Sequence, residues 1–226
     1  LKQIYPDLRI GAAEALQCPT LLQNGFGAHR IEGIGDKHVP WIHNVKNTDM
    51  VVAVDDTDCM EVLRLFNEPE GVSYLKKTGI GDELAQNLPL LGISGIGNLL
   101  GAIKFAKYYE LDKRDTVFTI LTDSMELYGS RIEEMRTDLG AYTAEGAAVS
   151  YSASLQGQRT DSMLELTYLE KKRVHNLKYY TWIEQQGRTL DELNAQWFDR
   201  DYWPRIQSLA DPIDNLIEDF NRDILA

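Results

Sequence analysis

The sequence predicts an α/β fold, in which a mostly parallel sheet with helices on both faces is followed by a mainly helical C-terminal extension. Three observations support this class. Residues 50–54 (MVVAV) and 117–121 (VFTIL) are continuous apolar runs, as in strands buried on both faces. Helix-period patterns alternate with these runs along the chain. Capping signals then open two helices near the C-terminus.

The first elements are short strands joined to helices by polar turns. Residues 8–14 (LRIGAAE) predict a buried strand and residues 50–54 a stronger one. Asp58 is expected to begin a helix, because Glu61 three residues later completes a capping box. The acidic cluster of Asp55, Asp56 and Asp58 is therefore assigned to helix capping rather than to a metal site.

Residues 92–109 (GISGIGNLLGAIKFAKYY) combine a glycine-rich start with an amphipathic helix. Apolar residues recur at three- and four-residue steps, and Lys104 and Lys107 are expected on the exposed flank. The glycines could cradle an anion with free N–H groups or could be only the start of the helix. The pattern matches neither a P-loop nor a dinucleotide fingerprint. We interpret it as structural, at the edge of a site.

The chain changes character after residue 142. Residues 146–162 are small and polar, which predicts a loop or linker. Thr189 and Glu192 form a second capping box. Residues 211–226 predict an amphipathic helix with Asp211 as N-cap, Pro212 at the first position and a buried apolar stripe for packing or subunit contact. We therefore divide the chain into an α/β domain, 1–142, and an extension, 143–226.

Composition excludes several classes of function. A formal net charge of −12 argues against a nucleic-acid surface. No apolar run approaches the roughly 20 residues of a membrane helix, and no signal peptide is visible. The two cysteines match no metal or redox spacing, which favours a cytoplasmic setting. His29, His38 and His43 lack zinc spacing, so no metal site is expected, and His175 in KKRVHNLK is expected on a solvated helix face.

Ligands of such sheets bind beyond the carboxyl ends of the strands, which selects the loops after Glu14, after Val54 and at 122–124. Three segments in fixed order, 27–40 (GAHRIEGIGDKHVP), 90–98 (LLGISGIGN) and 117–131 (VFTILTDSMELYGSR), carry a family resemblance. They resemble the later half of fold type II pyridoxal-phosphate enzymes, the cysteine synthase and cystathionine beta-synthase family, which is tryptophan-synthase-beta-like. The resemblance covers residues 1–136.

The resemblance implies pyridoxal 5'-phosphate as cofactor and assigns roles to individual positions. Ser124 would meet the pyridine nitrogen, although a serine there is also a favoured helix N-cap. Gly33 and Ile34 resemble the loop along the cofactor ring, where glycine allows close backbone approach. Gly35, Asp36 and Ser94 would face the substrate. The implied reaction is β-elimination or β-replacement on an amino acid such as serine, cysteine or an activated serine.

Two parts of the family's machinery have no counterpart in this sequence. The Schiff-base lysine and the glycine- and threonine-rich phosphate loop would both come before residue 1, so the catalytic residues are unknown here. We expect a complementary N-terminal half to supply them, the chain alone to be inactive, and the complete enzyme to be a homo-oligomer. The competing interpretations are a non-catalytic scaffold or pseudoenzyme subunit and an independent nucleotide-binding α/β domain.

Overall fold

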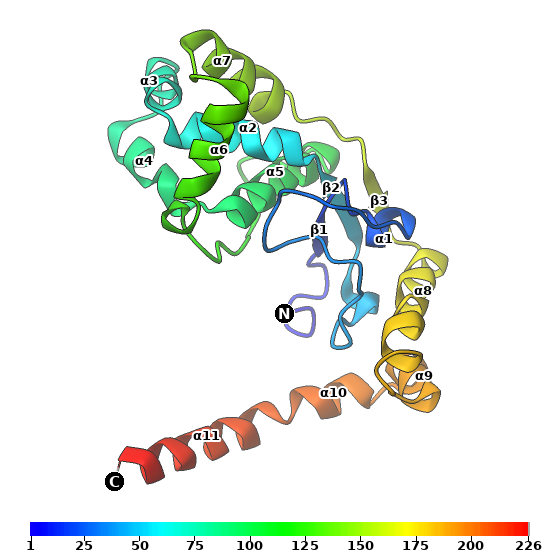
Figure 1. Ribbon diagram of the computed structural model, residues 1–226. Helices are drawn as coiled ribbons and strands as arrows, with labels where there is room; N and C mark the ends of the chain where they lie inside the picture. The colour runs from blue at the N-terminus through cyan, green and yellow to red at the C-terminus, as the bar shows by residue number, and fades with distance from the viewer. Residues whose placement is uncertain (226) are drawn as a thin grey trace. The chain divides into compact units, whose positions relative to one another are not determined.

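The two strands predicted at the start of the chain form a small mixed sheet with a third strand that was not predicted. Its order is β1 (Gly11–Ala15), β2 (Met50–Val54) and β3 (Met163–Glu165) (Figure 1). β1 runs parallel to β2, with Gly11 opposite Met50 and Ala15 opposite Val54, whereas β3 runs antiparallel to β2. All five residues of β2 are buried, as its apolar run predicts. A mostly parallel sheet is not confirmed.

The computed structural model describes residues 1–225, which divide into two compact units. The first comprises Leu1–Lys37 and Thr48–Thr167, and the second comprises His38–Asn47 and the chain from Tyr168 onward. This division differs from the one expected at residue 142, because residues 143–167 pack with the first unit and a short earlier segment joins the second. Ala226 lies outside the described residues.

The first unit also contains helices, of which α5 (Ile93–Tyr108) and α1 (Thr20–Gln23) pack on the sheet. The others are α2 (Asp56–Asn67), α3 (Pro69–Lys77), α4 (Asp82–Asn87), α6 (Gly129–Leu139) and α7 (Ala144–Val149), with short turns η2 (Leu88–Leu90), η3 (Met125–Leu127) and the π-helical η4 (Ser150–Gln156). α5 packs on β1 and β2, and α2 packs on α5 and η4. The buried apolar core lies mainly between these elements.

The start of α2 differs from the prediction by three residues. Its N-cap is Asp55, whose side chain accepts a hydrogen bond from the Thr57 N–H at 2.7 Å. The expected cap, Asp58, lies within the first turn and accepts instead from the Gln158 amide at 2.9 Å. Asp55 directly follows β2, so its carboxylate is the first in the chain that can reach the free N–H groups at the start of α2.

Lys104 corrects the expected exposed flank of α5. Its side chain is buried, and Nζ donates to the Ala53 carbonyl oxygen of β2 at 2.8 Å. Asp161 lies 3.4 Å from the same amine, and burial lowers the pKa of Lys104. The long side chain thus reaches past the apolar surface of α5 to a carbonyl of the sheet. Lys107, by contrast, is exposed as predicted.

Residues 117–121 do not form the predicted strand. They are extended coil, with Phe118 81% and Ile120 64% exposed. A strand requires a neighbour to satisfy its backbone, and none of the three described strands pairs with this run. The strand prediction is therefore wrong for this chain as it stands.

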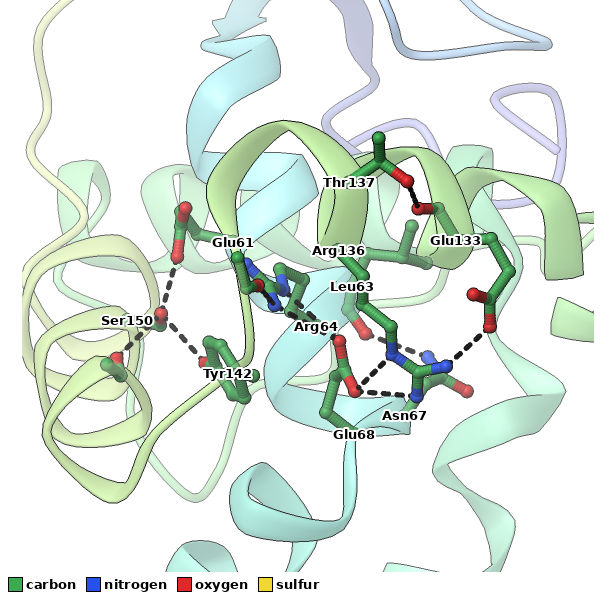
Figure 2. Close-up of polar contacts among 12 residues, drawn as sticks. Glu61, Leu63, Arg64, Asn67, Glu68, Glu133, Arg136, Thr137, Tyr142 and Ser150 are labelled. Atoms are coloured by element: carbon green, nitrogen blue, oxygen red, sulfur yellow. Dashed lines mark hydrogen bonds and ion pairs between the residues drawn. The ribbon is translucent and has the colours of Figure 1, made fainter.

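The predicted linker at 146–162 is also wrong, since most of it is helical. Thr143 caps α7 by accepting from the Gly146 N–H at 3.1 Å. The Ser150 hydroxyl then donates to Glu61 of α2 at 2.6 Å and accepts from the Tyr142 hydroxyl at 2.8 Å (Figure 2). Small residues let η4 approach α2 and α7 approach α3 closely, and tertiary contacts override their loop-like composition.

A buried carboxylate links α2 to α6 (Figure 2). Glu68 is 4% exposed and accepts from Arg64 Nη2 at 3.2 Å and from Arg136 Nη2 at 2.8 Å. The Arg64 guanidinium, itself 4% exposed, also donates to the Gly140 carbonyl at 2.9 Å and lies over the Tyr142 ring. Each buried charge therefore has both an opposite charge and hydrogen-bond partners.

The second unit is helical and rich in tryptophan. It contains η1 (Val45–Asn47), α8 (Tyr168–Asn176), the π-helical η5 (Tyr179–Ile183), α9 (Leu190–Phe198), α10 (Tyr202–Gln207) and α11 (Ala210–Leu225). The predicted cap of α9 is confirmed, because Thr189 accepts from the Glu192 N–H at 3.2 Å. Lys178 is fully buried and donates to the Trp41 and His43 carbonyls at 2.9 and 2.7 Å.

Two predictions for the second unit are corrected. His175 is buried, not solvated, and its ring nitrogen Nε2 lies 3.1 Å from the Leu193 carbonyl. α11 begins at Ala210, so Asp211 lies in its first turn and is not the N-cap. The apolar stripe of α11 is exposed rather than buried, with Leu216 at 68% and Phe220 at 63%. A stripe with this pattern usually packs on another surface.

Within residues 1–225 no single helix is both long and apolar enough to cross a membrane. Asp82–Leu90 and α5 reach that length only as a pair, which is bent by 118°.

Candidate functional site

The glycine-containing loop after β1 surrounds a hollow of about 520 Å³ in the first unit. Four of the residues assigned from the sequence line it: Gly33, Ile34, Gly35 and Asp36. The remaining lining residues are Cys18, Phe26, Gly27, His29 and Lys37. The volume lies within the usual range for small-molecule sites, roughly 300–1,000 Å³.

Two glycines give this loop its shape. Gly33 and Gly35 have φ of +92° and +89°, a region that disfavours residues with a Cβ. A Cβ on Gly35 would lie 3.0 Å from His29 Nε2 and 3.1 Å from the Ala15 Cβ. A Cβ on Gly33 would lie 3.1 Å from the Ser94 Cβ. The backbone therefore approaches β1 and α5 as only glycine allows.

Neighbouring elements hold both ends of the loop. The Arg30 N–H and its guanidinium both donate to Asp56 at 3.0 Å, which ties the loop to the first turn of α2. Ile31 is fully buried, and Gly97 of α5 leaves room for it: a Cβ there would lie 3.1 Å from Ile31 Cγ2. Arg131 of α6 donates through Nε to Glu32 at 2.9 Å. Three helices thus fix the loop.

The start of α5 carries an anion, but this anion belongs to the chain itself. The Gly92 N–H donates to the Asp123 carbonyl at 3.1 Å, and the Ser94 hydroxyl donates to Asp123 Oδ1 at 3.3 Å. A Cβ on Gly92 would lie 2.1 Å from the same Oδ1. A carboxylate at a helix N-terminus is favoured by the dipole. The glycine-rich start of α5 is therefore filled by its own side chains, consistent with a structural role.

Asp123 also orders the polar cluster next to Gly33. Thr122 and Ser94 share a hydrogen bond of 2.8 Å between their hydroxyls. The Tyr128 hydroxyl donates to Asp123 Oδ2, and this bond raises the pKa of Tyr128 to about 12. The structure therefore brings Gly33, Ser94 and the loop at 122–124 together, although they are distant in sequence.

Ser124 lies at the end of this cluster and does not line the hollow. It is half-buried and extended, and it occupies the N-cap position of η3 (Met125–Leu127) without a capping side-chain hydrogen bond. The alternative role as a helix cap is therefore not supported. Ser94 is buried behind Gly33 and does not line the hollow either.

His29 is a lining residue that sequence reasoning considered only as a metal ligand. A carbonyl oxygen only accepts, so His29 Nε2 donates to the Gly35 carbonyl at 2.6 Å. Its Nδ1 is the one buried side-chain nitrogen or oxygen in residues 1–225 without a hydrogen-bond partner. Lys37 is the only lysine among the lining residues. No sequence pattern indicated either role, because both depend on how the loop turns back on β1.

Fold and site together define an α/β chain whose glycine loop, after a sheet strand, borders a hollow of the size of a small-molecule site. Comparison with curated proteins is more specific. The chain is 30% identical over 128 residues to the cysteine synthase of Staphylococcus aureus (strain Mu50) and to cysteine synthase B of Campylobacter jejuni. The matches cover 57% of the chain, and 35% and 36% of these relatives. The chain thus spans about a third of their length.

These matches confirm the resemblance to the cysteine synthase family that the sequence motifs indicated. The chain is homologous to a part of a cysteine synthase. No family model matches the chain. No solved structure matches it.

Proposed function

We propose that this chain is the later part of a pyridoxal-phosphate-dependent enzyme that acts at the β-carbon of an amino acid. The observation that supports this most strongly is the homology to cysteine synthases, which depend on this cofactor, combined with the hollow around Gly33–Gly35. β-Elimination or β-replacement on serine, cysteine or an activated serine is the proposed reaction, and the cytoplasm its proposed location.

The residues present fit one wall of a cofactor site. The positive φ of Gly33 and Gly35 turns the loop so that its backbone borders the hollow, where a flat ring could lie against it. The buried, unpartnered Nδ1 of His29 offers an acceptor near that wall. By contrast, the glycine-rich start of α5, which could have bound an anion, is already occupied by the Asp123 carboxylate. The phosphate grip must therefore come from elsewhere.

In this proposal, each residue of the chain has a limited task. Gly33 and Ile34 would lie along the ring. Ser124, at the end of the neighbouring polar cluster, would hydrogen-bond to the pyridine nitrogen where the site extends beyond the hollow. Gly35 and Asp36, which line the hollow, would face the amino-acid substrate, and the buried Ser94 would support the loop from behind Gly33. When bound, the cofactor withdraws electrons from the substrate's α-carbon and so permits loss of the β-substituent. A neutral hydroxyl at the ring nitrogen moderates that withdrawal.

The lysine that binds the cofactor covalently and the phosphate loop belong, in this proposal, to a complementary N-terminal half. The chain's share of its relatives' length leaves room for such a part. The complete enzyme is proposed to be a homo-oligomer. The alternative is a non-catalytic scaffold, which would keep the later half of the fold for assembly.

The test measures cofactor uptake by the complete protein through its visible absorbance. We expect saturable uptake, and after borohydride reduction and digestion we expect the cofactor on a lysine outside this chain. Cofactor attached to Lys37 would contradict the proposal that the complementary half supplies the lysine. A correctly folded complete protein without uptake would favour the scaffold.

A matched pair of serine variants tests the role of Ser124. Ser124→Ala should weaken cofactor binding about tenfold, since one hydrogen bond to the ring is lost. Ser152→Ala is the control, because that exposed hydroxyl bonds only to helix carbonyls at 148 and 149. Equal cofactor affinity in both variants would contradict the assignment.

A further inference from the structure

The loop that borders the hollow runs directly into a segment of the second unit. Asp36 and Lys37 line the hollow, and the residues that follow, 38–47, belong to the second unit before the chain returns to β2. We name residues 38–47 the connecting segment. It contains neither helix nor strand before η1, so its buried backbone groups need partners from elsewhere in the protein.

Side chains of the C-terminal chain, residues 168–203, supply these partners within the second unit. Donors from α8, from η5 and its N-cap and from α9 reach carbonyl oxygens along the connecting segment. These bonds run from Trp182 Nε1 to Val39 at 2.8 Å, from Lys178 Nζ to Trp41 and His43 at 2.9 and 2.7 Å, from Gln196 Nε2 to Trp41 at 3.2 Å, and from Lys171 Nζ to Lys46 at 2.9 Å. The connecting segment is therefore held by side chains much later in the sequence.

Lys178 is the centre of this arrangement. Its side chain is fully buried, and it also donates to Gln196 Oε1 at 2.8 Å, so all three N–H groups of the ammonium have acceptors. The rings of Trp41 and Trp203 lie 5.9 and 5.6 Å from Nζ. Burial lowers the pKa of Lys178 to about 7. A buried charge is costly and is tolerated where its hydrogen bonds are complete, so these bonds fix the carbonyls that accept them.

The loop before the connecting segment has an anchor at each end. At its start, Arg30 donates to Asp56 at 3.0 Å. At its end, Val39 follows Lys37 by two residues and accepts from Trp182. Two residues of chain span at most about 7 Å, so little slack separates this second anchor from the hollow. Fixing both ends of a loop restricts its backbone to fewer arrangements.

We propose that the C-terminal chain positions the loop that borders the hollow, by holding the connecting segment into which this loop runs. Lys178 and Trp182 are then positioning residues, which act on the site through the backbone and not by contact with a ligand. The family resemblance ends at residue 136 and supplies no counterpart for this hold. The inference goes beyond the proposed function, because it concerns the loop whichever ligand the hollow takes.

The two free cysteines report separately on the loop and on the core of the first unit. Cys18 lines the hollow but is only 3% exposed, and the loop packs on its neighbour: a Cβ on Gly27 would lie 2.6 Å from the Gln17 carbonyl oxygen. Cys59 of α2 is fully buried, and its thiol donates to the Ile93 carbonyl at 3.4 Å. A loosened loop should therefore expose the first thiol and leave the second protected.

The test measures how fast each thiol of the chain reacts with N-ethylmaleimide, assigned by peptide mass spectrometry. Lys178→Met removes three donors and keeps an unbranched side chain. We expect Cys18 to react at least about tenfold faster and Cys59 at an unchanged rate, since several hydrogen bonds to the connecting segment are lost. Lys171→Met is the matched control, because its bond lies at the far end of that segment, and both rates should stay unchanged.

Two results would overturn the proposal. One is an unchanged Cys18 rate in Lys178→Met. The other is an equal acceleration of Cys18 and Cys59, which would mean that the C-terminal chain supports the whole fold and not the loop in particular.

A milder variant, Trp182→Phe, decides the matter if Lys178→Met does not fold. It removes the bond to Val39 and keeps an aromatic ring beside Trp41. Loss of one hydrogen bond should make Cys18 react roughly threefold faster, with Cys59 unchanged. Hydrogen exchange on the same variant should show faster exchange at 33–37 and unchanged exchange in β2. Unchanged rates at Cys18 and at 33–37 would contradict the positioning role. Neither measurement uses a cofactor, so this inference and the proposed function can fail separately.

Discussion

Removing the charge of Glu68 should destabilise the protein far more than removing an exposed charge. Glu68→Gln leaves the Arg64 guanidinium, whose side chain is only 5% exposed, without its counter-charge. Breaking a buried ion pair on one side costs about 3–5 kcal/mol. Arg136, the second partner of Glu68, is 42% exposed and can be solvated by water. The loss of its pair with Glu68 therefore adds little to the cost. We therefore expect the free energy of unfolding to fall by about 3–5 kcal/mol.

Urea unfolding followed by circular dichroism measures this loss, with Glu133→Gln as the control. Glu133 pairs with Arg136, but its side chain is 70% exposed, and such pairs contribute about 0–1 kcal/mol. The double substitution of Arg64 and Glu68 by methionine should recover much of the stability, because it removes both buried charges. If Glu68→Gln costs no more than Glu133→Gln, the buried network does not stabilise the fold as argued.

Three further predictions concern pH, the glycine loop and α11. Burial lowers the pKa of His175 and of His43 to about 4, below the ordinary 6.5. As the pH falls, the unfolded chain therefore binds these protons before the folded chain does. The free energy of unfolding should fall between about pH 6.5 and 4, by roughly 3 kcal/mol for His175. Urea unfolding midpoints measured across that pH range check this. Gly35→Ala should cost clearly more than Gly79→Ala by thermal unfolding, since both have positive φ but only Gly35 is crowded. Ile217→Asp on α11 should lower the oligomer mass measured by light scattering. An unchanged mass would argue against this stripe as a subunit contact.

Elements defined by local chemistry could be predicted from the sequence. β2 follows from five apolar residues, and the α9 cap follows from Thr189 and Glu192 three positions apart. Residues 117–121 have an equally strong strand pattern, but a strand also requires a neighbour, which no local pattern can supply. The helices at 144–156 were missed because their stability depends on contacts such as Ser150 with Glu61.

Burial of charged residues was the least predictable property. Lys104 belongs to an amphipathic helix pattern and His175 to a basic run, yet each reaches a backbone carbonyl inside the fold. In the candidate site, the glycines could be located from the family resemblance. The hydrogen bond from His29 to Gly35 could not be predicted, because it joins residues across a turn whose left-handed backbone only the structure defines.

The edge of β1 that no described strand pairs with has a consequence for the solubility of the chain. Unpaired backbone groups beside an apolar surface will accept almost any extended chain, including another molecule in the same condition. Copies of the chain in which this edge stays open should therefore associate through it and precipitate at high concentration.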